Sequence, residues 1–177
     1  MKIERLELFL LRLPYVHFFE TSFGRSYDRT FILIKVEAEG LAGWGECTAE
    51  ESPLYSGETT ETAWHVLKDF LVPLVFKKNI SGPGEFQRAA SIYRGNRMAK
   101  AGLELAFWDL QAKAAGVPLA KLYGGTRTEI EAGVSVGIED SLPELVDRVG
   151  SYLGQGYRRI KIKIKPGWDA AACRAVR

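Results

Sequence analysis

The sequence contains few cysteines and no long hydrophobic run, and each absence excludes a class of protein. Two cysteines among 177 residues are too few for a disulfide framework, and their scarcity favours a reduced, cytoplasmic compartment. No stretch approaches about 18 consecutive apolar residues, so no membrane-spanning helix and no membrane partner are expected. Residues 1–13 lack the long apolar stretch and the cleavage site that are typical of a signal peptide.

An excess of charge of one sign is also missing from the chain as a whole. The 24 Lys and Arg residues nearly balance the 22 Asp and Glu residues, which leaves a net charge of +2. A chain with so small an excess produces no field that would draw it to nucleic acid, so no nucleic-acid partner is expected. The hydrophobic fraction of 46% and the charged fraction of 26% are ordinary for a globular protein of one or two domains.

Locally the balance fails, because residues 151–177 carry many basic side chains and one acidic one, Asp169. The basic residues are Arg158, Arg159, Lys161, Lys163, Lys165, Arg174 and Arg177. Such an imbalance indicates that acidic groups from elsewhere, or an acidic ligand, lie against this segment.

The first part of the chain has the pattern of an antiparallel meander. Branched and aromatic residues predict strands over 3–13, 30–37 and 41–46, with the first strand ending at Pro14. A polar turn is expected at residues 24–28, between the first two strands.

Helical spacing of apolar residues follows the meander. It predicts helices over 59–70, 85–93 and 98–115, with Gly116 and Pro118 ending the last of them. We therefore expect an α+β domain over residues 1–125.

The pattern changes after Gly125. Strands are predicted over 130–138 and 157–164, and helices begin after Ser141 and Asp169, so that strand and helix alternate with short connections. This order is typical of a parallel sheet, and its repeat length is close to that of a (β/α) TIM-type barrel. A closed barrel needs about 250 residues, so residues 126–177 are interpreted as the first two βα units of an incomplete barrel domain. The last helix has no stop signal, and the chain is expected to be the truncated front part of a longer protein.

The lysine-rich segment 158–165 allows three interpretations. Along a strand the side chains alternate, so the isoleucines face one way and Lys161, Lys163 and Lys165 the other. An exposed edge strand, whose lysines block further pairing, is one interpretation. A nucleic-acid strip is a weaker one, because no aromatic residues interleave with the lysines. In a barrel the lysines would instead face the interior, and their C-terminal end would lie at the active site. Crowded cations favour a neutral lysine that accepts a proton, and the acidic partners would come from later strands or a metal site.

A series of short motifs also follows one fixed order along the chain. They are Thr21-Ser22-Phe23-Gly24, Gly43-Trp44-Gly45-Glu46-Cys47, Tyr55-Ser56-Gly57-Glu58-Thr59, the segment 98–109, Leu122-Tyr123-Gly124-Gly125, Gly133-Val134-Ser135-Val136-Gly137 and Lys161-Ile162-Lys163. In this order the set resembles the enolase superfamily. More narrowly, it resembles the o-succinylbenzoate synthase / N-succinylamino acid racemase family of the muconate-lactonizing subgroup.

The resemblance implies an α+β capping domain followed by a (β/α) barrel, and a reaction on a small carboxylate substrate. In that reaction Mg²⁺ binds the substrate carboxylate, a lysine removes the α-proton, and the metal stabilises the enediolate. Dehydration to o-succinylbenzoate and racemisation of an N-acylated amino acid share this machinery. A dipeptide epimerase or a muconate cycloisomerase of the same superfamily is an alternative, and a non-catalytic binding or assembly fragment is an alternative of another class. The complete protein is expected to be a homo-oligomer.

The resemblance also assigns roles to individual residues. Lys163 matches the catalytic base and Lys161 its neighbour, which helps to hold the carboxylate. The residues matched to substrate binding are Ser135, at the end of the first barrel strand, and Phe19, Phe23 and Tyr55, in two capping loops. Lys165, at the Pro166 turn, is expected to be solvated. The family's metal ligands lie on later barrel strands, so none is assigned in this chain, and no metal is expected to bind the 177 residues alone.

Overall fold

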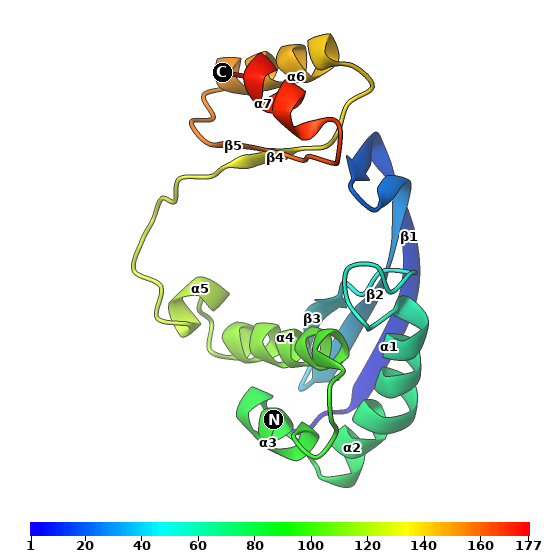
Figure 1. Ribbon diagram of the computed structural model, residues 1–177. Coiled ribbons are helices and arrows are strands. Elements are labelled where there is room, and N and C mark those ends of the chain that lie inside the picture. The colour runs from blue at the N-terminus through cyan, green and yellow to red at the C-terminus, as the bar shows by residue number, and fades with distance from the viewer. The chain divides into compact units, whose positions relative to one another are not determined.

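The computed structural model describes residues 1–177, which divide into two compact units (Figure 1). The first unit is formed by residues 1–13 and 30–126, and the second by residues 14–29 and 127–177. The second unit thus includes the tip of the hairpin made by the first two strands. The linear division expected from the sequence, 1–125 and 126–177, stays a prediction.

The first three strands form the antiparallel meander that the sequence predicts. They are β1 (Arg5–Thr21), β2 (Gly24–Ala38) and β3 (Leu41–Cys47), in the order β1-β2-β3. β2 and β3 pair antiparallel from Ile32 opposite Cys47 to Ala38 opposite Leu41.

β1 differs from its prediction because it continues through Pro14 to Thr21. As the edge strand of the sheet it has a partner on one side only, and an edge tolerates a residue that has no backbone N–H to donate. The turn predicted at 24–28 is therefore displaced to Ser22 and Phe23, and β2 begins at Gly24.

The helical segment after β3 also runs beyond its predicted end at Phe70. It consists of α1 (Thr60–Val66), the π-helical turn η1 (Leu67–Leu71) and α2 (Val72–Lys77). In η1 the N–H of Val72 bonds the carbonyl of Leu67, five residues back. This wider turn lies directly before Pro73, which has no N–H for the ordinary ladder, so the helix passes the proline instead of stopping.

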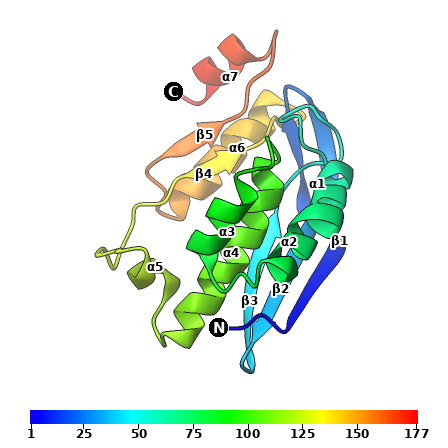
Figure 2. The same ribbon diagram turned by 90° about the horizontal axis from the view of Figure 1, so that it is seen from below.

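Three further helices complete the first unit: α3 (Pro83–Ala90), α4 (Arg97–Ala114) and α5 (Leu119–Leu122). α4 runs alongside β3 (Figure 2). A Cβ on Gly45 would stand 2.0 Å from the carbonyl oxygen of Gly102, and one on Gly43 would stand 2.2 Å from that of Ala106. Glycine is required at these positions because the helix backbone rests on the strand.

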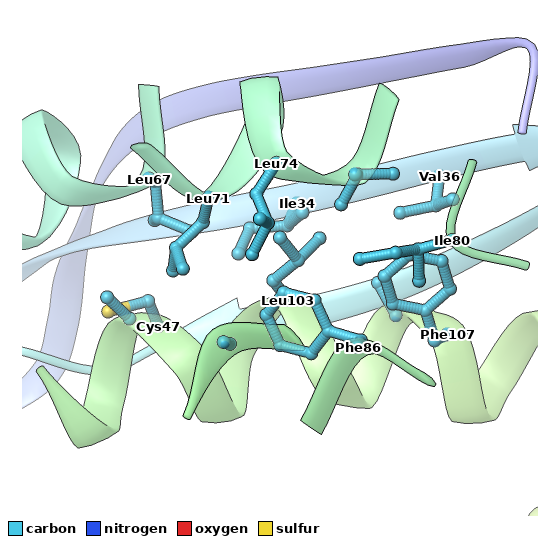
Figure 3. Close-up of a cluster of buried hydrophobic side chains, with 14 of the residues drawn as sticks. Ile34, Val36, Cys47, Leu67, Leu71, Leu74, Ile80, Phe86, Leu103 and Phe107 are labelled. Atoms are coloured by element: carbon cyan, nitrogen blue, oxygen red, sulfur yellow. The ribbon is translucent and has the colours of Figure 1, made fainter. Parts of the chain in front are cut away.

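The core of the first unit lies between the sheet and its helices (Figure 3). Its fully buried members include Ile34 and Val36 of β2, Leu67 and Leu71 of η1, Leu103 and Phe107 of α4, and Phe86 of α3. The rings of Phe86 and Phe107 lie 5.6 Å apart. Because each such side chain contributes about 1.5–3 kcal/mol relative to exposure, this cluster stabilises the unit.

In the second unit, strands and helices alternate as predicted. β4 (Val134–Val136) pairs parallel with β5 (Ile160–Ile162), and α6 (Leu142–Gly154) and α7 (Asp169–Ala175) lie on one side of them (Figure 1). Both strands are shorter than their predictions. Ser141 caps α6 as expected, its hydroxyl accepting the N–H of Glu144. No helix of the chain combines the length and the apolar character that crossing a membrane requires.

Candidate active site

The register of the two parallel strands places Ser135 beside Lys161. Ile160 and Ile162 pack against the small core of Val136, Leu145, Val149 and Ala172, under α6 and α7. Since side chains alternate along a strand, Ser135 and Lys161 occupy the opposite face, where both are exposed. Ile164 does not continue the pattern, because it lies beyond the end of β5 and is 48% exposed.

Lys163 extends the pairing one step past β5 and meets an aromatic ring. Its N–H donates to the carbonyl of Val136 at 2.9 Å. Its Nζ lies 5.8 Å from the centre of the Phe19 ring, within the range of a cation–π contact. The structure therefore brings together two predicted site residues, Phe19 and Lys163, that lie far apart in the sequence.

The third lysine of the segment, Lys165, is only partly solvated: 41% of its side chain is exposed, and its ammonium group is paired with a carboxylate, which the expectation did not include. Its Nζ bonds Glu20 Oε1 at 2.6 Å, and Glu20 Oε2 accepts from Arg25 Nε, also at 2.6 Å. Hydrogen bonds from Lys165 and then Arg25 hold the pKa of the Glu20 carboxyl below its ordinary value. The hairpin tip thus supplies the acidic partner that the lysine-rich segment lacks.

The hairpin tip is held against the segment after β4 by further contacts. Arg25 also pairs with Asp140, and its guanidinium carbon lies 3.7 Å from the centre of the Phe18 ring. Hydrogen bonds to Asp140 and then Glu20 raise the pKa of Arg25. The N–H of Ile138 donates to the Glu20 carbonyl at 3.0 Å. The tip therefore has both backbone and ionic contacts within the second unit.

A second ionic group involves residues that sequence reasoning missed. Glu139 is 5% exposed, and its Oε2 lies 3.1 Å from His17 Nε2 while its Oε1 lies 3.4 Å from Arg148 Nε. His17 had no expected role. The basic excess of residues 151–177 does not indicate this group, because both His17 and Arg148 lie outside that segment.

Two predicted residues have no side-chain partner. Phe23 stands at the two-residue turn between β1 and β2 and is 57% exposed. Tyr55 belongs to the first unit, in the segment 48–58, and is 72% exposed.

A metal would find no ready site among these residues. No group of three or more His, Cys, Asp or Glu side chains is placed to hold an ion. Three carboxylates lie near the lysines, and each already pairs with an arginine: Glu20 and Asp140 with Arg25, and Glu139 with Arg148. Glu139 also contacts His17. The described residues alone therefore do not fit a Mg²⁺ ion, which prefers several free oxygen ligands.

The fold and the lysine-bearing strand define a class of protein in which an α+β domain is followed by alternating strands and helices. Lysines lie on the exposed face of one of the parallel strands. Residues 7–124 match the N-terminal domain of the mandelate racemase / muconate lactonizing enzyme family. The chain belongs to this family, which confirms the resemblance drawn from its motifs.

Its relatives are enzymes. The chain is 51% identical over 160 residues to an o-succinylbenzoate synthase of Geobacillus kaustophilus, covering 90% of this chain and 43% of that protein. It is 46% identical over 177 residues to an N-succinylamino acid racemase of Thermus thermophilus, covering 100% of this chain and 48% of that protein. The chain thus spans about half the length of the curated relatives it matches.

Solved structures agree on the fold. A member of the enolase superfamily from Listeria innocua matches with a TM-score of 0.90 and 38% identity, over 100% of this chain and 48% of that one. A mandelate racemase/muconate-lactonizing protein from Roseovarius nubinhibens, complexed with magnesium, matches with a TM-score of 0.85 and 25% identity, over 99% of this chain and 50% of that one.

Proposed function

We propose that the complete protein removes the proton next to a carboxylate, in dehydration to o-succinylbenzoate or in racemisation of an N-acylated amino acid. The observation that carries the proposal is the row formed by Ser135, Lys161 and Lys163 on the open face of β4 and β5, with Phe19 beside Lys163. We interpret residues 126–177 as the first two βα units of a barrel, whose active sites form at the C-terminal ends of the strands. Lys163 stands at that end of β5.

Each residue of the row has a distinct role in this reaction. The α C–H bond breaks, its proton passes to Nζ of Lys163, and its electron pair enters the carboxylate system as an enediolate. The Lys161 ammonium attracts the substrate carboxylate, and the Ser135 hydroxyl contacts the substrate beside it. The Phe19 ring lies beside the Lys163 amine and shields that side of it from water.

A divalent metal completes the proposal, with its ligands outside these 177 residues. When bound next to a carboxylate, such an ion stabilises negative charge that develops on oxygen. The magnesium held by the Roseovarius protein supports this choice of metal.

The substrate is proposed to be a small carboxylate whose tail is chosen by Phe19, Phe23 and Tyr55. Phe23 and Tyr55 are exposed outside the helices and strands, where a side chain can contact a ligand without disturbing the fold. Phe19 lies in β1 and not in the loop expected from the sequence, and its ring is beside Lys163. The free thiols of Cys47 and Cys173 support a reducing, cytoplasmic location for the protein.

The test is exchange of the substrate α-proton with D₂O in the complete, Mg²⁺-loaded protein, using each enantiomer of N-succinyl-phenylalanine in turn. Lys163→Ala should abolish deuterium uptake from the enantiomer whose hydrogen faces Lys163, since loss of a positioned base costs about 10²–10⁴-fold or more. The exposed control Lys68→Ala should leave uptake unchanged. Near-normal uptake in Lys163→Ala would contradict the proposal and favour the edge-strand interpretation of the lysines.

A further inference from the structure

Glu20 is the most enclosed charged residue of the hairpin tip, with 9% of its surface exposed. Its two carboxylate oxygens are bonded on opposite sides, Oε1 to Lys165 and Oε2 to Arg25, each at 2.6 Å. Neither the motif pattern nor the comparisons assign it a role. Both carboxylate oxygens are therefore engaged, and little of the side chain is exposed to solvent.

The main chain of Glu20 is fixed as well. Its carbonyl accepts the N–H of Ile138 at 3.0 Å. A Cβ on Gly137 would stand 3.2 Å from the Glu20 nitrogen and 3.5 Å from Cδ2 of Phe19, so the two segments approach closely. Phe19 directly precedes Glu20, so the contacts that hold the main chain and side chain of Glu20 also hold the main chain of Phe19. The ring of Phe19 lies beside Lys163.

Glu20 also distinguishes Lys165 from the other two lysines of its segment, Lys161 and Lys163. Lys165 is engaged by a carboxylate, whereas neither Lys161 nor Lys163 forms an ion pair. Only the Lys161 and Lys163 side chains are therefore free of a protein carboxylate and available to a substrate. If Lys165 were released, a third cation would compete for the same ligand and for the space around Lys163.

We propose that Glu20 is a positioning residue for Lys163: by pairing with Lys165 and anchoring Phe19, it fixes the surroundings of the proposed base. The inference rests on the proposed function of Lys163. Docking of the hairpin does not depend on Glu20 alone, because Arg25–Asp140, His17–Glu139 and the backbone bond to Ile138 remain when its charge is removed.

The experiment uses the complete, Mg²⁺-loaded protein, and both enantiomers of N-succinyl-phenylalanine in D₂O. Four variants are compared: Glu20→Gln, Lys165→Met, the double variant, and the exposed control Glu131→Gln. Each single variant should slow deuterium uptake from the enantiomer that Lys163 serves by about tenfold, through kcat more than KM, because small misplacement of a reacting group is costly. Uptake from the opposite enantiomer, whose α-proton would be removed by a second base outside these 177 residues, should stay within about twofold.

The double variant should be no slower than either single one, since residues that act as a unit have non-additive effects. Equal losses for both enantiomers, additive losses, or unchanged uptake in Glu20→Gln and Lys165→Met would each overturn the inference. Lys165 is partly exposed, so its variant keeps the test decisive even if Glu20→Gln folds poorly. If Lys163→Ala itself retained uptake, the proposed function would fail instead, which separates the two results.

Discussion

The carboxylate of Glu58 caps a helix that begins almost forty residues later in the chain. Its Oε1 and Oε2 each lie 3.0 Å from the N–H nitrogen of Met98, and Oε2 lies 3.2 Å from that of Ala99, at the start of α4. Asn96, the local cap position, has left-handed backbone and no side-chain bond to the helix. Glu58 therefore satisfies the free N–H groups, places negative charge at the helix N-terminus and ties the end of segment 48–58 to α4.

Removing this cap should destabilise the chain. Glu58→Ala is expected to lower the free energy of unfolding by about 1–2 kcal/mol, because two N–H groups at the helix end lose their acceptor. Urea denaturation followed by circular dichroism measures the loss. Glu129→Ala, at an exposed position outside the helices and strands, is the matched control and should change stability by less than about 0.5 kcal/mol. Similar midpoints for both variants would show that water replaces the cap at no cost.

The close packing of α4 on β3 predicts a larger effect for an added methyl group. Gly45→Ala should destabilise the chain by at least about 3 kcal/mol, because the new Cβ meets backbone atoms that cannot rotate away. Gly57→Ala is the control, since a methyl group there would meet no atom within 4 Å and the backbone of Gly57 is not left-handed. Equal urea midpoints for the two variants would contradict the packing described for this interface.

The two thiols should differ sharply in reactivity. Burial raises the pKa of the Cys47 thiol, which disfavours the reactive thiolate, whereas Cys173 on α7 is exposed. A thiol reagent such as Ellman's reagent should titrate one equivalent rapidly in the native chain and two in guanidinium chloride. In Cys173→Ser the rapid equivalent should vanish. Rapid reaction of that variant under native conditions would mean that Cys47 is accessible.

Acid should weaken the docking of the hairpin tip. The ion pairs hold the pKa of Glu20 below its ordinary value of 4.5, so the folded state binds fewer protons than the unfolded one. The stabilisation is therefore complete above that value and is lost as the pH falls through the lower, native pKa. Amide protection factors in residues 14–29 should decline on acidification over this range, and the decline should be smaller in Glu20→Gln. An identical decline in both proteins would assign it to another group.

Local patterns in the sequence predicted the elements well where one face of an element is apolar. The alternation of Ile160 and Ile162 with Lys161 placed the isoleucines under the helices, and Ser141 caps α6 as its sequence indicates. The helix expected over 59–70 runs on past Pro73, because a π-helical turn absorbs the missing donor in a way that periodicity does not reveal.

The candidate site shows the complementary limit. The sequence placed Phe19 and Lys163 in one site by resemblance, and the structure brings them together. It gave no indication that Glu20 pairs with Lys165, because an ion pair between residues 145 positions apart leaves no periodic trace. The basic excess predicted only that some acidic partner exists.

The division of one hairpin between two compact units has a consequence for the order of folding. Residues 14–29 belong with 127–177, so their partners are synthesised long after they are. With 145 positions between Glu20 and Lys165, a ribosome needs on the order of 7–30 s to cover the distance. During that interval the base of the hairpin can pair within the first unit while its tip stays undocked. The charged side chains of the tip, Glu20 and Arg25 among them, help it to remain in water without aggregating until its late partners emerge.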